Sequence, residues 1–209
     1  MKTKSWLIIS FVVILSMNGL FVETILSQEI DYGKDRNGTL YYRYCYPEEC
    51  TSWMEVPSSS GSQLTIQEVM QILEVHNQIR AVVGNEPLIW SSDIAMYAQE
   101  WVNHLAVTTC SLSHRPSFGE YAQQYGENAF MGTLGHYGVK DAMRSWEQEK
   151  SDYEGQTINA ENYRIFGHYT QLIWDKSVEI GCGKAACYGR IIIFCNYDPA
   201  GNTIGERPY

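Results

Sequence analysis

The chain has 209 residues, of which 44% are apolar and 13% aromatic, and this composition excludes a wholly disordered protein. It carries 15 Lys and Arg against 24 Asp and Glu, which gives a formal net charge of -9. A nucleic-acid-binding protein needs a basic face to neutralise phosphates, so the charge argues against that class. The net charge also gives no overall attraction to anionic membranes. The composition indicates one globular domain, with room for an appendage.

The first 27 residues have the composition of a secretory signal peptide. Lys2 and Lys4 precede an apolar run over 7–15, and small or polar residues lead to Ser27, after which we expect cleavage. A membrane anchor is the alternative interpretation, but a span needs about 20 apolar residues. Glu23 falls inside a window of that length. The sequence therefore predicts a secreted, extracellular protein with no stable membrane span.

All six cysteines follow the predicted signal peptide. They are Cys45, Cys50, Cys110, Cys182, Cys187 and Cys195. An even count in a secreted chain indicates three disulfides, and six cysteines allow about 15 pairings. Zinc ligation by thiolates is the alternative interpretation. The spacing Cys-x4-Cys occurs twice, but it lacks the further Cys or His partners that a zinc finger needs.

Residues 28–63 are predicted to form an N-terminal extension and a Ser/Gly linker. The segment contains five tyrosines but no apolar period, so we expect a loop followed by the flexible run 58–62. Asn37 begins an Asn-Gly-Thr sequon for glycosylation. The main domain is predicted over 64–205.

Within that domain, apolar residues recur at helical spacing in four segments. We expect helices near 66–83, 93–106 and 139–150, and a short one from about 168. Strand-forming residues predict a strand near 128–133 and a hairpin over 178–186 and 190–197. Early helices and late antiparallel strands favour an α/β fold, a three-layer α-β-α sandwich with a central antiparallel sheet.

Four motifs occur in a fixed order along the domain. They are HNQIR at 76–80, GEN at 126–128, GHYTQLIWDKS at 167–177 and CNYDPAGN at 195–202. Together they resemble the CAP superfamily of cysteine-rich secretory, antigen-five and pathogenesis-related-one proteins, whose domain is also called SCP. The chain is also similar to venom-allergen-like members. The resemblance covers about 64–202 and implies the three-layer CAP fold.

The resemblance also implies the disulfide pairing. It pairs Cys110 with Cys187 and Cys182 with Cys195, which leaves Cys45 with Cys50 outside the family's core. A third family disulfide would need cysteines at Tyr125 and Asp198, and both are missing together.

CAP domains have a cleft lined by two histidines and two glutamates. The residues that match are His114, Glu127, Glu149 and His168. Glu149 is preferred over Glu147 because it lies three positions after Trp146, on an adjacent helix face. His76 lies on the apolar stripe of the first helix, and we expect it to be a packed, hydrogen-bonded structural residue.

Three chemistries fit two imidazoles and two carboxylates in one cleft. They bind a divalent cation such as zinc, act as general acid and base, or form a structural hydrogen-bonded network. No cofactor is required for the other roles. Hydrolysis needs an activated nucleophile, and the sequence contains neither a Gly-x-Ser-x-Gly nor a His-Glu-x-x-His motif. We therefore expect a protein that is not an enzyme, with a weak hydrolase as an alternative.

The resemblance implies that the leading function is extracellular binding of a sterol at a surface loop or of a fatty acid between helices. Seven apolar residues of the first and third helices would be candidate walls, although such stripes are more often plain core. They are Ile66, Val69, Leu73, Ile79, Val139, Met143 and Trp146. The alternative function is a protein-interaction effector that acts on a host or immune receptor.

Overall fold

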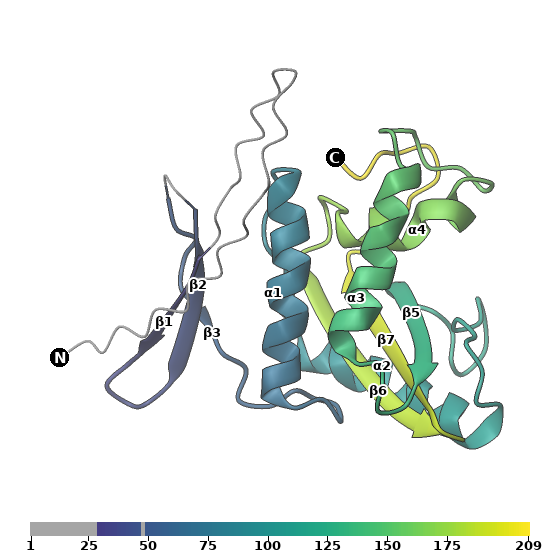
Figure 1. Cartoon of the computed structure of the whole chain (residues 1–209), viewed down its shortest axis with the longest axis horizontal. Coiled ribbons are helices and arrows are strands. Elements are labelled where there is room, and N and C mark those ends of the chain that lie inside the picture. The colour runs from purple at the N-terminus through teal and green to yellow at the C-terminus, as the bar shows by residue number, and fades with distance from the viewer. Residues whose placement is uncertain (1–28, 47–48) are drawn as a thin grey trace. The chain divides into compact units, whose positions relative to one another are not determined.

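The computed structural model describes residues 29–46 and 49–209, so the predicted signal peptide lies outside the described residues (Figure 1). The chain divides into two compact units between Val56 and Pro57, and each unit is described by itself. None of the helices in the described ranges is long and apolar enough to cross a bilayer.

The first unit contains a three-stranded antiparallel sheet. Its strands are β1 (Glu29–Lys34), β2 (Leu40–Cys45) and β3 (Met54–Glu55), in the order β1-β2-β3. The expectation of a loop in this segment is wrong. The pattern has period 2, but it is carried by tyrosines rather than aliphatic residues: Tyr42 and Tyr44 are buried, whereas Tyr41 is not.

The second unit contains four helices that position the candidate site. They are α1 (Ile66–Val82), α2 (Ser92–Thr108), α3 (Val139–Gln148) and α4 (Tyr163–Leu172). The expected capping box starts α1, where Thr65 and Glu68 exchange hydrogen bonds. The third helix ends earlier than predicted and continues as a 3₁₀ turn, η1 (Glu149–Asp152). The fourth begins earlier than predicted, and its backbone is kinked at Phe166.

A four-stranded sheet forms the middle of the second unit. Its strands are β4 (Ile89–Trp90), β5 (Gly126–Thr133), β6 (Glu179–Cys187) and β7 (Arg190–Asp198), in the order β4-β6-β7-β5. The β6–β7 hairpin and its neighbour β5 are antiparallel, as predicted, whereas the two-residue β4 runs parallel to β6. The edge strand β5 carries one of the four candidate site residues.

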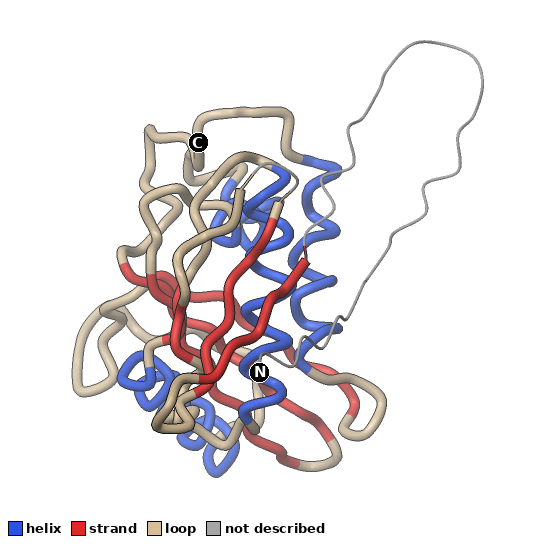
Figure 2. Tube along the Cα trace, turned by 90° about the vertical axis from the view of Figure 1, so that its left-hand side faces the viewer, coloured by secondary structure: helices blue, strands red, loops and turns tan. Residues whose placement is uncertain are grey.

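Helices cover both faces of this sheet, which confirms the three-layer α-β-α fold (Figures 1 and 2). On one face α2 lies so close that a Cβ at Gly183 would come within 2.5 Å of the Gln99 backbone nitrogen. The other face is covered by α1, α3 and α4 (Figure 1). Val69 and Leu73 of α1 and Met143 of α3 are fully buried, so the apolar stripes considered as ligand walls contribute to the core.

Candidate functional site

The first His/Glu pair lies beside the edge strand β5. His114 Nδ1 is 2.7 Å from Glu127 Oε1, and the Arg115 backbone N–H donates to the same oxygen at 3.2 Å. Asn196, which lies opposite Glu127 on β7, donates to Oε2 at 3.2 Å. The Glu127 side chain is 0% exposed, whereas that of His114 is 47% exposed. A buried carboxylate with three donors therefore orients an imidazole that reaches solvent.

The second pair links η1 to the kinked helix α4. His168 Nδ1 is 2.6 Å from Glu149 Oε1, and Glu149 Oε2 accepts the backbone N–H groups of His168 and Tyr169 at 2.9 and 3.1 Å. The kink at Phe166 starts a new helical segment at this point. N–H groups in the first turn of a helical segment have no partner within it and carry partial positive charge, so a carboxylate is stabilised there.

Neighbouring side chains fix the second imidazole. The ring of Trp146 stacks on that of His168, with centroids 6.2 Å apart and 14° between the planes. The Trp146 indole N–H donates to the Ala129 carbonyl of β5 at 3.0 Å, which anchors α3 to the edge strand. The His168 side chain is 36% exposed, so this ring also reaches solvent.

Strand β5 connects the two pairs. Successive side chains of a strand point to opposite faces, so Glu127 and Asn128 face different layers. Asn128 donates to the His168 carbonyl at 3.0 Å, while Glu127 holds His114. The phenol of Tyr163 lies near both carboxylates. Partial burial is the main cause that raises the pKa of Tyr163, and the negative charges of Glu127 and Glu149 raise it further. The four predicted residues thus gather around one sheet edge.

The arrangement is two pairs rather than one cluster of four ligands. Among residues 29–46 and 49–209, no three His, Cys, Asp or Glu side chains lie together as a metal site. An ionised carboxylate only accepts hydrogen bonds, so each Nδ1 carries a proton, and the neutral form of each ring then has its lone pair on Nε2. Histidine ligands of metals are commonly held by a carboxylate in this way. Each imidazole is thus oriented by its own carboxylate, as histidine ligands commonly are. We call these four residues the paired site.

An activated side-chain nucleophile would be a hydroxyl or thiol held by one of the imidazoles. Within the described ranges, no Ser, Thr or Cys side chain is hydrogen-bonded to either imidazole ring.

The cysteines are joined as the resemblance implied. The disulfides are Cys45–Cys50, Cys110–Cys187 and Cys182–Cys195.

Three supporting residues were missed by the sequence reasoning. Asn128 and Asn196 lie within the GEN and CNYDPAGN motifs, where only their membership of a motif was noted. Arg115 had no signal beyond its place next to His114. Its buried guanidinium lies 3.6 Å from the centroid of the Tyr97 ring and pairs with Glu100 at 2.9 Å, which fixes the backbone N–H that binds Glu127.

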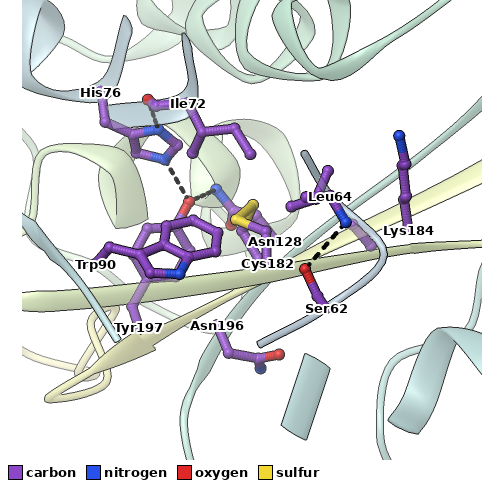
Figure 3. Close-up of a disulfide and its surroundings, with 12 residues drawn as sticks. Ser62, Leu64, Ile72, His76, Trp90, Asn128, Cys182, Lys184, Asn196 and Tyr197 are labelled. Atoms are coloured by element: carbon purple, nitrogen blue, oxygen red, sulfur yellow. Dashed lines mark hydrogen bonds between the residues drawn. A yellow bond between two sulfur atoms is a disulfide. The ribbon is translucent and has the colours of Figure 1, made fainter. Parts of the chain in front are cut away.

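His76 is not one of the paired-site residues, and the prediction that it is a packed, hydrogen-bonded structural residue is confirmed. Figure 3 shows its hydrogen bonds to Ile72 and Tyr197. Its Nδ1 donates to the Ile72 carbonyl at 2.9 Å, and its Nε2 accepts from the Tyr197 hydroxyl at 2.8 Å. Asn128 donates to the same hydroxyl at 3.3 Å. Complete burial lowers the pKa of His76 to about 3. This network ties α1 to β7 and β5 beneath the paired site.

Comparisons with known sequences identify a family. The family model described as "Cysteine-rich secretory protein family" (CAP) matches residues 73–197. The chain is 41% identical over 155 residues to pathogenesis-related protein 1B of Nicotiana tabacum, which covers 74% of this chain and 86% of that protein. It is also 41% identical over 140 residues to pathogenesis-related protein 1 of Arabidopsis thaliana, covering 66% and 80%.

Solved structures share the fold at lower identity. The crystal structure of NaASP2 with Zn2+ aligns with a TM-score of 0.61 and 21% identity, over 73% of this chain and 88% of that one. The structure of BmVAL-1 aligns with a TM-score of 0.59 and 24% identity, over 73% and 86%.

Proposed function

Because the chain belongs to the CAP family of cysteine-rich secretory proteins, we propose that it acts outside the cell and binds a divalent cation through the Nε2 atoms of His114 and His168. One observation carries the proposal: each imidazole donates through Nδ1 to its own glutamate, at 2.7 and 2.6 Å, and is partly exposed. Both rings are thereby held in the tautomer that a metal needs.

Zinc is the cation to test first. Imidazole nitrogen is a good zinc ligand, and with two protein ligands water would fill the remaining positions of a tetrahedral shell. The crystal structure of NaASP2 is one with Zn2+. An open site of this kind predicts modest affinity and exchangeable metal, in accord with a regulatory role rather than a structural one.

Calorimetric titration of Zn²⁺ into the secreted protein tests the cation site. His114→Ala and His168→Ala should each abolish the heat of Zn²⁺ binding. Glu127→Gln should lower the Zn²⁺ affinity about 10- to 100-fold, because the His114 ring loses its orienting carboxylate. His136→Ala is the matched control, since this exposed histidine lies in the turn after β5. Unchanged binding in either paired-site histidine variant would overturn the proposal.

We further propose that the protein binds a sterol or fatty acid at the surface beside the paired site. The stripes of α1 and α3 are packed core, whereas apolar side chains border the paired site in the open: Leu112 is 49% exposed and precedes His114 by two residues, and Tyr163 is 41% exposed. An amphipathic ligand would place its hydroxyl or carboxylate head at the imidazoles and its apolar body along this border.

Binding of fluorescent sterol and fatty acid probes tests the lipid proposal. Leu112→Ser and Tyr163→Ser should weaken binding several-fold, whereas Ile204→Ser, another exposed apolar position, should not. Zn²⁺ should strengthen fatty acid binding alone, because only that head is an anion. If neither probe binds, the lipid proposal is wrong, and an effector that binds an extracellular protein receptor becomes the better hypothesis.

A further inference from the structure

Four exposed apolar side chains lie at the end of the second unit where β6 turns into β7. They are Val107, Leu134, Tyr137 and Tyr188, and we call them the apolar tip. Three connections converge there. The Leu134 N–H donates to the Gly189 carbonyl at 2.9 Å, and Leu134 and Tyr137 form an isolated β-bridge. The Cys110–Cys187 disulfide ties the segment after α2 to the end of β6. The arrowhead of β6 marks this end in Figure 1.

Tyr188 adopts a backbone conformation that its side chain does not favour. Its φ is 44°, and that of the next residue, Gly189, is 75°. Both residues of the β6–β7 turn therefore have a left-handed backbone conformation. Asn-Gly or Gly-Gly is typical of such a turn, because a bulky side chain is strained there. The side chain is 92% exposed, so packing within the chain does not offset this cost. Residues that keep such strain cluster at functional sites and ligand contacts.

The charge around the apolar tip differs from that of the whole chain. The three segments that build it, 103–119, 128–140 and 180–197, contain no Asp or Glu, although the chain has 24 of them. Lys140 and Arg190 are exposed beside the tip, and neither forms an ion pair with any residue that the structure describes. The neighbouring carboxylate of Asp141 instead accepts the Gly138 N–H at 2.9 Å, at the start of α3.

We propose that the apolar tip docks on the surface of a lipid bilayer. Tyr137 and Tyr188 have the amphipathic rings that favour the headgroup region, and Leu134 and Val107 would enter the acyl boundary beneath it. Lys140 and Arg190 would face anionic headgroups. Exposed apolar and aromatic side chains bordered by Lys140 and Arg190, on segments that contain no Asp or Glu, fit a membrane surface better than a free solvent surface. The docking does not require the cation or the lipid ligand.

Vesicle co-sedimentation of the full secreted protein tests the docking. Vesicles of phosphatidylcholine alone are compared with vesicles that also contain phosphatidylserine. Leu134→Ser and Tyr188→Asn should each lower the partition coefficient about fivefold. Tyr188→Asn should at the same time raise the melting temperature, because Asn tolerates the left-handed backbone. The double variant Lys140→Gln and Arg190→Gln should bind phosphatidylcholine vesicles as the wild type does. It should lose only the increase in partition coefficient that phosphatidylserine produces.

Val82→Ser is the matched control, because Val82 is an exposed apolar residue at the end of α1. The docking would be overturned if Val82→Ser lowered the partition coefficient equally, or if Tyr188→Asn left it unchanged. It would also be overturned if the wild-type protein bound neither vesicle, a result that would point to a protein partner. Zn²⁺ titration of each variant separates the proposals. Intact Zn²⁺ binding without vesicle binding overturns only the docking, and the reverse result overturns only the cation site.

Discussion

At the scale of single residues, His76 is the buried histidine whose titration is tied to folding. Burial holds its pKa at about 3, below the ordinary value of 6.5, so the folded state keeps the ring neutral. The unfolded chain then binds one more proton between these values. The contribution of the neutral His76 ring to the free energy of unfolding is therefore complete above pH 6.5, and it is lost as the pH falls toward 3.

The pH dependence of unfolding measures this effect. Between about pH 6 and pH 4, the free energy of unfolding of the wild type should fall more steeply than that of His76→Gln, by up to about 1.4 kcal/mol per pH unit. Gln keeps a donor and an acceptor and has no proton to gain in this range. Parallel slopes for the two proteins would contradict the account of His76.

The identities of the site residues were predictable, but their partners were not. The resemblance placed two histidines and two glutamates near each other, and spacing from Trp146 favoured Glu149 over Glu147. It did not indicate that each glutamate serves one histidine. That pairing depends on the kink at Phe166 and on the face of β5 from which Glu127 projects, and neither feature has a signal in the apolar pattern.

At the scale of elements, Glu149 determines how the second segment of α4 begins. Its carboxylate accepts the backbone N–H groups of His168 and Tyr169. Glu149→Ala should destabilise this segment by about 1 kcal/mol, the typical value of a helix N-terminal cap. Amide hydrogen exchange at His168 and Tyr169 should therefore become several-fold faster.

Glu147→Ala is the control for the exchange experiment. Glu147 belongs to α3 and makes no hydrogen bond or ion pair with the site residues described above. If both variants accelerate exchange equally, or if neither does, then Glu149 does not cap α4 in solution.

The approach of α2 to the sheet depends on glycine in β6. A Cβ at Gly183 would lie 2.5 Å from the Gln99 nitrogen and 2.8 Å from the Ala98 carbonyl carbon, both of which are backbone atoms that cannot rotate away. Gly183→Ala should therefore lower the free energy of unfolding by about 3 kcal/mol. Gly138→Ala is the matched control in denaturant unfolding, because an added Cβ there meets nothing within 4 Å. Equal stabilities of these two variants would contradict the close packing of α2.

The regular elements of the second unit were predictable because their apolar periods are long. Strands β1 and β2 were missed because alternating tyrosines are not counted as an aliphatic pattern, and the two-residue strands β3 and β4 are too short to show a period. The start of α4 was missed because Tyr163 and Ile165 are exposed, so the first segment of that helix has no apolar stripe.

At the scale of the whole molecule, the family match and the fold concern the second unit. The matched residues, 73–197, lie entirely after the division at Val56 and Pro57. The net charge of the chain was also a poor guide to its surfaces. An overall charge of -9 coexists with an end of the second unit whose segments contain no carboxylates. Folding joins these segments through the pairing of β5 with β7 and the Cys110–Cys187 disulfide.

The central proposal is that His114 and His168, each held by its own glutamate, bind one cation through their Nε2 atoms. Electron paramagnetic resonance of the protein loaded with one equivalent of Cu²⁺ tests it most directly, because the hyperfine pattern counts the nitrogen ligands. We predict two imidazole nitrogens in the wild type, one in His114→Ala or His168→Ala, and two in His136→Ala. A single nitrogen in the wild type, or a pattern that neither variant alters, would contradict the claim.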